Sequence, residues 1–107
     1  MNRLWKRKTV ERRSAPDLTL YASAWCPYCM MVFHALDALD LDVRRVDPRD
    51  DVEARRALYE ARGHGTVPVL RIDHPDGRVE WMPESRDIVR WLRARYAVPA
   101  PAGADGG

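Results

Sequence analysis

Two cysteines separated by two residues are the side chains of this sequence best suited to chemistry. The segment Cys26-Pro27-Tyr28-Cys29 contains both cysteines of the 107-residue chain. With this spacing, a disulfide formed between a substrate and the first sulfur can be attacked by the second. We therefore assign Cys26 as the nucleophile and Cys29 as the resolving thiol of a thiol–disulfide exchange.

A metal site is the weaker interpretation of the two thiols. A structural zinc ion takes four ligands, commonly with a second pair of Cys or His residues. The three histidines of the chain, His34, His64 and His74, stand apart from one another. The sequence therefore predicts no metal ligands.

The thiols must be positioned by the segments around them. Residues 17–22 alternate apolar and polar side chains and predict a first strand. The apolar residues that follow recur at helical spacing, so a helix should begin between Cys26 and Tyr28, with Pro27 in its first turn. Cys26 would then lie at the N-terminus of the helix, where free N–H groups and the helix dipole stabilise a thiolate.

The rest of the chain continues with strand and helix signals. Residues 41–47 predict a charged strand, which suits an edge of the sheet. The further predicted elements are a helix over 51–62, strands over 69–72 and 78–82, and a last helix opened by Pro83-Glu84-Ser85, with Ser85 as its N-cap. The order strand-helix-strand-helix-strand-strand-helix predicts an α/β fold with a mixed four-stranded sheet, because a helical crossover joins parallel strands and a hairpin joins antiparallel ones.

Charge and composition divide the chain into three parts. Residues 1–16 carry a net charge of +5, and because the whole chain carries +2, the remainder sums to −3. We expect a basic, flexible arm over 1–16, an ordered domain over 17–96 and a disordered tail over 97–107, which is rich in Pro, Ala and Gly. Nucleic-acid binding is not expected, since the net positive charge lies in the arm and the rest of the chain is mildly acidic.

The sequence also limits where the protein acts. No apolar run approaches the roughly 18 residues that a membrane span needs, and no apolar stretch follows the basic N-terminus as it would in a secretory signal. We expect a cytoplasmic protein with no integral membrane segment. We also expect a monomer.

The motif Cys26-Pro27-Tyr28-Cys29, followed later by Thr66-Val67-Pro68, resembles the dithiol glutaredoxins of the thioredoxin fold over residues 17–96. The resemblance implies a four-stranded mixed sheet flanked by three helices, and glutathione as co-substrate with no bound cofactor. It also implies a cis peptide bond before Pro68. The free-energy cost of a cis peptide bond is small only when the bond precedes a proline. The backbone N–H and C=O of Val67 would form hydrogen bonds with glutathione. Thr66 and Tyr28 would lie beside the groove that binds glutathione.

Two positions depart from the glutaredoxin pattern. Many glutaredoxins carry Lys or Arg three residues before the first cysteine, where this chain has Ser23. Trp25, directly before Cys26, is similar instead to the tryptophan of thioredoxins. The alternative interpretation of Trp25 is that its ring packs against the sheet edge.

The start of the last helix resembles a different branch of the superfamily. Glu84-Ser85 looks like the Glu-Ser motif of glutathione transferase N-terminal domains, where the serine and the helix-start amides receive the γ-glutamyl carboxylate. Ser85 and the backbone of Arg86 are the candidates here, because a helix N-terminus binds anions. For the glycine carboxylate, the sequence does not distinguish among Arg55, Arg56 and Arg62. A full transferase is disfavoured because the chain stops where a second, helical domain would begin.

The resemblance implies a glutathione-dependent thiol–disulfide oxidoreductase of cell redox homeostasis and electron transport. Its substrates would be protein–glutathione mixed disulfides and protein disulfides. Two alternatives stay open. One is a thioredoxin-like disulfide reductase fed by a flavoprotein reductase, and the other is a non-enzymatic module that binds glutathione and an iron–sulfur cluster.

Overall fold

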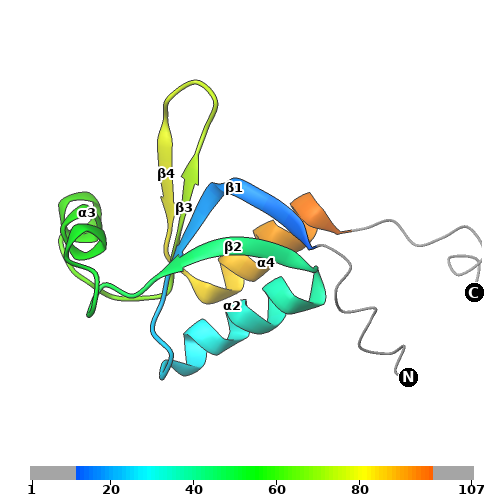
Figure 1. The fold of residues 1–107 in the computed structure, drawn as a ribbon, viewed down its shortest axis with the longest axis horizontal. Coiled ribbons are helices and arrows are strands. Elements are labelled where there is room, and N and C mark those ends of the chain that lie inside the picture. Colours follow the sequence, from blue (N-terminus) through cyan, green and yellow to red (C-terminus); the bar gives the residue numbers. More distant parts are fainter. Residues whose placement is uncertain (1–11, 98–107) are drawn as a thin grey trace, which may run out of the picture.

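The computed structural model describes residues 12–97, which form one four-stranded sheet and three helices (Figure 1). The observed order of elements is the predicted one. In chain order the elements are β1 (Arg13–Tyr21), α2 (Pro27–Ala38), β2 (Leu41–Val46), α3 (Val52–Arg62), β3 (Val69–Asp73), β4 (Val79–Met82) and α4 (Ser85–Tyr96). The expected thioredoxin-like α/β fold is confirmed.

The sheet has the strand order β2-β1-β3-β4 and mixes both strand directions. β1 runs parallel to β2 and antiparallel to β3, and the β3–β4 hairpin is antiparallel. The charged strand β2 lies at an edge, as predicted. The C-terminal end of β1 leads directly into the loop that carries the cysteine motif.

Helices cover the two faces of the sheet unequally. Figure 1 shows α2 and α4 together on one face, with α3 standing apart on the other side. Successive strand residues point to opposite faces, so Leu20 of β1 joins the core under α2 and α4, whereas Tyr21 joins a smaller cluster with Leu58 of α3. The main core also contains Val32, Leu36, Leu70, Ile88 and Leu92, all of them fully or almost fully buried.

Local capping explains the limits of α3. The carboxylate of Asp51 accepts a hydrogen bond from the amide of Ala54 at 3.0 Å, which caps the helix N-terminus. At the other end Gly63 adopts the left-handed conformation with φ of 81°, which favours glycine. The predicted helix over 51–62 is therefore confirmed, with Asp51 as its cap.

The first strand begins at Arg13, four residues before the predicted start. The early start follows from backbone pairing of Arg13 and Ser14 with the start of β2, to which side-chain hydrogen bonds add. Arg12 donates to the carbonyl of Leu41 at 2.8 Å, and Arg13 donates to that of Leu39 at 2.7 Å. The register with β2 shifts between Ser14 and Thr19, a stretch that contains Pro16, which has no N–H to donate. The predicted arm and tail otherwise fall on residues 1–11 and 98–107, outside the described part of the chain.

Candidate active site

Cys26 lies at the junction between β1 and α2. It is the N-cap residue of α2, and Pro27 occupies the first helical position. A proline is tolerated there because an N–H at this position makes no hydrogen bond within the helix. The backbone amide of Cys29 donates a hydrogen bond to the sulfur of Cys26 at 3.4 Å. Cys26 is partly exposed, so its sulfur combines access for a substrate with the positive end of a helix.

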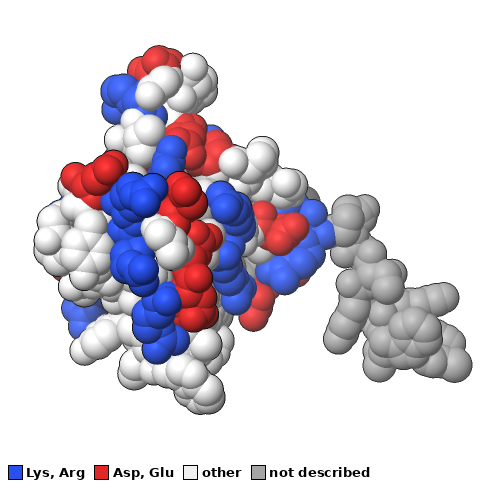
Figure 2. Space-filling model, turned by 60° about the vertical axis from the view of Figure 1, so that its left-hand side comes forward, with Lys and Arg blue, Asp and Glu red and all other residues white. Residues whose placement is uncertain are grey.

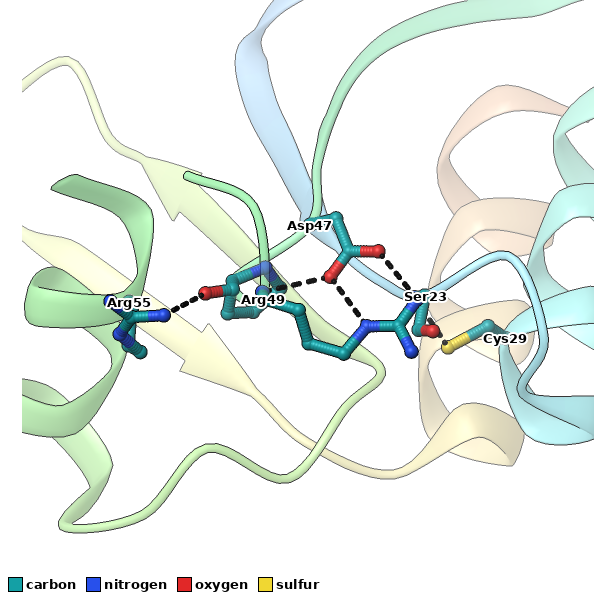
Figure 3. A network of polar contacts seen from close by, with 6 residues as sticks. Ser23, Cys29, Asp47, Arg49 and Arg55 are labelled. Carbon is teal, nitrogen blue, oxygen red and sulfur yellow. Dashed lines mark hydrogen bonds and ion pairs between the residues drawn. The ribbon is translucent and has the colours of Figure 1, made fainter. Parts of the chain in front are cut away.

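Cys29 lies one turn inside α2 and is fully buried. Its sulfur accepts a hydrogen bond from the backbone amide of Ser23 at 3.3 Å (Figure 3). Burial raises the pKa of Cys29 to about 11, and this effect outweighs the lowering by the Ser23 amide. Cys29 is therefore a protonated thiol at neutral pH.

The loop before β3 approaches the nucleophile from the other side. The Val67–Pro68 peptide bond is cis, as the resemblance implied. The carbonyl oxygen of Val67 lies 4.0 Å from the sulfur of Cys26. Thr66 is exposed, and its amide donates to Nδ1 of His64 at 3.4 Å. The structure thus brings the Thr66-Val67-Pro68 segment to the thiol, although 36 residues separate the two motifs along the chain.

The start of α4 differs from the predicted arrangement. Ser85 is not the N-cap: it is the first residue of the helix, and Glu84 is the cap residue without a side-chain hydrogen bond. The Ser85 hydroxyl is buried and donates to the sulfur of Met31 at 3.8 Å, so it points toward α2. The first helical bond is made by the amide of Ile88 to the carbonyl of Glu84, which leaves the amides of residues 85–87 without helical partners.

The three arginines proposed for a carboxylate have different surroundings. Arg55 donates to the carbonyl of Pro48 at 3.2 Å, and Arg56 lies 3.8 Å from the carboxylate of Glu53. Nε of Arg62 is buried and has no hydrogen-bond partner within residues 12–97. Arg55 and Arg56 line one surface hollow of α3, and Arg62 is not among its lining residues.

Sequence reasoning did not single out Asp47 and Arg49. Arg49 donates to both carboxylate oxygens of Asp47, through Nε at 3.3 Å and Nη2 at 3.1 Å, and through its backbone amide at 2.9 Å (Figure 3). These hydrogen bonds hold the pKa of Asp47 below its ordinary value. The carboxylate in turn helps to raise the pKa of Cys29. An Asp-Pro-Arg segment between a strand and a helix start was the available signal.

Large apolar side chains surround the motif on the surface. Trp25 is 85% exposed and Tyr28 is 63% exposed, while Met30 and Met31 are each 40% exposed. The interpretation that Trp25 only packs against the sheet edge is therefore wrong. These four exposed apolar residues lie within one short stretch of the chain, and exposed apolar side chains of this kind can contact a partner molecule.

Within residues 12–97, no three His, Cys, Asp or Glu side chains are grouped closely enough to hold a metal ion. In the same part of the chain, no helix has the length and apolar character to cross a membrane.

Known families and curated proteins are similar to most of this chain. Residues 20–101 match the glutathione S-transferase N-terminal domain family. Mycoredoxin 1 of Corynebacterium glutamicum is 30% identical over 79 residues, which are 73% of this chain and 95% of that protein. A glutaredoxin of Pseudomonas aeruginosa is 32% identical over 57 residues, covering 53% of this chain and 68% of that one.

Solved structures of larger proteins contain the same fold. Maleylacetoacetate isomerase from Anaeromyxobacter dehalogenans, solved with glutathione bound in its active site, is 26% identical with a TM-score of 0.57. The similarity covers 78% of this chain but only 39% of the isomerase. The trimeric glutathione transferase TDR1 of Leishmania is 29% identical with a TM-score of 0.61, covering 75% of this chain and 18% of that one.

Proposed function

The chain belongs to the glutathione S-transferase N-terminal domain family and is glutaredoxin-like, and from this premise we propose that it is a glutathione-dependent thiol–disulfide oxidoreductase. Its substrates are protein–glutathione mixed disulfides and protein disulfides. Glutathione is the co-substrate, and no bound cofactor is needed. The observation that carries the proposal is the difference between the two thiols: Cys26 is accessible at a helix N-terminus, and Cys29 is buried beneath it.

The first step is an attack by the Cys26 thiolate on the glutathione sulfur of a mixed disulfide. The disulfide bond of the substrate breaks, and its protein sulfur leaves as a thiolate that takes a proton from solvent. A second glutathione, as thiolate, then attacks the glutathione sulfur held on Cys26. This releases the Cys26 thiolate and glutathione disulfide, so the sulfur of one incoming glutathione is oxidised to the disulfide level for each protein thiol that is freed.

Chain groups around the thiol bind the glutathione portion of the substrate. The backbone of Val67 lies beside Cys26 and pairs with the cysteinyl unit of glutathione. The free amides at the start of α4, including that of Arg86, receive the γ-glutamyl carboxylate, together with the Ser85 hydroxyl. Tyr28 and Thr66 are exposed near these groups and contact the tripeptide.

The buried state of Cys29 favours the route that uses one thiol. In the two-thiol route Cys29 attacks a disulfide between Cys26 and a substrate protein, and it must lose its proton to do so. A pKa of about 11 leaves very little thiolate at neutral pH. Attack by Cys29 thus carries the cost of deprotonating a buried thiol, which attack by a glutathione thiolate from solution does not.

The experiment is reduction of a glutathionylated peptide by the purified protein, with glutathione, glutathione reductase and NADPH. We expect Cys26→Ser to abolish turnover and Cys29→Ser to retain it, because only Cys26 forms the obligatory intermediate. Loss of turnover in Cys29→Ser would refute the one-thiol route. An inactive wild-type protein would refute the glutaredoxin function itself.

A second candidate function is a thioredoxin-like disulfide reductase that takes electrons from a flavoprotein. The exposed ring of Trp25 beside Cys26 favours it, as does Ser23 in the place where many glutaredoxins carry a cation. Reduction of insulin with thioredoxin reductase and NADPH, without turnover of the glutathionylated peptide, would select this function over the first.

A further inference from the structure

A groove of about 500 Å³ lies between α2 and α4 on the surface of the described domain. Its residues come from both helices: Met31 and His34 from α2, and Arg86, Val89, Arg90 and Arg93 from α4. The proposed catalytic steps use only Arg86 from this set, and only through its backbone amide. The rest of the groove therefore has no assigned role in the chemistry at Cys26.

The groove combines apolar and cationic surface. Met31 and the half-buried Val89 supply apolar surface. Arg86, Arg90 and Arg93 recur at spacings of four and three residues, so they lie along one face of α4. The charged side chains that line the groove are all arginines. A ligand that complements this surface is both acidic and partly apolar.

Nearby acidic groups leave most of this charge unbalanced. Asp87 lies 3.5 Å from Arg90 in an ion pair whose side chains are 54% and 77% exposed. Asp37 of α2 lies 3.3 Å from Arg12 instead. Among residues 12–97, neither Arg86 nor Arg93 forms an ion pair. Exposed pairs such as Arg90–Asp87 are weak, so an incoming carboxylate can replace Asp87 at little cost.

The groove is continuous with the proposed glutathione site. Met31 lines the groove and also accepts the hydrogen bond from Ser85. Arg86 follows Ser85 directly, and Arg93 lies two helical turns farther along α4, roughly 10 Å away at 1.5 Å per residue. A polypeptide whose disulfide is held at Cys26 can therefore extend along this groove.

Another face of the molecule has a different charge pattern. Figure 2 shows basic and acidic side chains interleaved over the face in view, without a large region of one sign. Neighbouring charges of opposite sign cancel over short distances in salt solution. The α2–α4 groove, where three arginines line one helix face, is better able to attract an acidic partner than such a mixed surface.

We propose that the α2–α4 groove binds an acidic segment of the protein substrate whose mixed disulfide is reduced at Cys26. This inference rests on the proposed function and names the substrate class. The guanidinium groups of Arg90 and Arg93 bind Asp or Glu carboxylates of the segment through charge-assisted hydrogen bonds. Met31 and Val89 receive an apolar side chain of the same segment.

The test compares three substrates of the glutathione-coupled assay. Two are glutathionylated peptides of equal length, one with Glu residues flanking the cysteine and one with Gln at the same positions. The third is the mixed disulfide of glutathione and 2-mercaptoethanol, which is too small to extend from the glutathione site to Arg90 and Arg93. The variant Arg90→Glu/Arg93→Glu removes the proposed contacts. The matched control, Arg44→Glu/Arg78→Glu, makes the same change of net charge on β2 and beside the β3–β4 turn.

We expect the wild type to prefer the acidic peptide, and the groove variant to lose about tenfold in kcat/KM for it. Turnover of the small disulfide stays unchanged, and the control variant keeps the preference. Roughly 0.5 M salt should remove the preference in the wild type, since it shortens the Debye length to a few ångströms.

Different results overturn different proposals. Equal kcat/KM for the two peptides in the wild type, or an equal loss in the control variant, would overturn the docking proposal alone. Absence of turnover with the small disulfide would overturn the proposed function, and the docking proposal with it.

Discussion

The backbone amide of Cys29 donates a hydrogen bond to the sulfur of Cys26, with 3.4 Å between the two atoms. One residue thus stabilises negative charge on the other while its own sulfur stays buried. The two thiols of the same turn consequently have opposite environments: one faces a substrate at a helix N-terminus, and the other lies in the core below.

We expect alkylation to distinguish the two thiols. With a pKa of about 11, Cys29 has a thiolate fraction of about one part in ten thousand at pH 7. Iodoacetamide should therefore modify Cys26 at least ~100-fold faster than Cys29 in the reduced, folded protein. Mass spectrometry of proteolytic peptides after timed quenching measures both rates. Similar rates would contradict the buried state of Cys29, and labelling in denaturant provides the control.

The raised pKa of Cys29 also predicts a pH dependence of stability. The folded protein keeps the proton up to a pH of about 11, whereas the unfolded chain loses it near 9.0. The contribution of the protonated Cys29 thiol to the free energy of unfolding is fully present below pH 9 and is lost as the pH rises toward 11. The free energy of unfolding of the reduced wild type should therefore fall by roughly 2–3 kcal/mol more over this interval than that of Cys29→Ala. Parallel pH profiles from urea denaturation would contradict the prediction.

Replacement of Ser85 tests the anion site at the start of α4. Ser85→Ala removes the buried hydroxyl but leaves the helix amides in place. We expect KM for a glutathione mixed disulfide to rise about 3- to 10-fold with little change in kcat, as for the loss of one hydrogen bond to a charged group. Ser14→Ala, at an exposed position of β1, is the matched control. An unchanged KM would exclude a binding role for the hydroxyl.

The end of α3 offers a test of local backbone geometry. At Gly63 the backbone has φ of 81°, and an added Cβ would meet no atom within 4 Å. Gly63→Ala should therefore destabilise the fold by about 1 kcal/mol, through backbone conformation alone. Glu60→Ala, at an exposed position of the same helix, should change stability by less than about 0.5 kcal/mol. Equal effects of the two variants in chemical denaturation would refute this account of the helix end.

The exposed ring of Trp25, next to Cys26, should contact protein substrates but not small disulfides. Since its side chain is 85% exposed, Trp25→Ala should change stability by less than about 0.5 kcal/mol. Its loss should lower kcat/KM for a protein disulfide by about 3- to 10-fold, because an exposed aromatic residue can anchor a partner. Turnover of the mixed disulfide of glutathione and 2-mercaptoethanol should stay the same. An equal loss on both substrates would mean that Trp25 acts on the thiol rather than on the partner.

Local sequence patterns predicted the helices and strands well, because the formation of a helix or strand depends largely on residues that are neighbours in the chain. The helix predicted over 51–62 begins at Asp51 and is followed directly by Gly63, and these two residues cap α3 in the structure. The start of β1 was missed because it depends on hydrogen bonds from Arg12 and Arg13 to residues more than 20 positions away. The periodicity of apolar residues in a short segment contains no information about contacts with residues so far away in the chain.

Some features of the candidate site could likewise be predicted from the sequence, and others could not. The Cys26-Pro27-Tyr28-Cys29 segment itself indicated a nucleophile at a helix start, because N-terminal capping is a local property. The orientation of Ser85 toward Met31, and the pair formed by Asp47 and Arg49, could not be inferred from spacing. The first arises from the packing of α4 against α2, and the second from the turn after β2.

Local sequence patterns were thus enough to predict the order of the elements, the edge position of β2 and the identity of the two thiols. The burial of Cys29, the carbonyl that faces Cys26 and the arginines that line a common groove became visible only in the folded chain. The reason is physical. Helix and strand signals arise over a few residues, whereas burial, and with it the pKa of Cys29, is set by chain segments that meet only when the sheet and helices pack together.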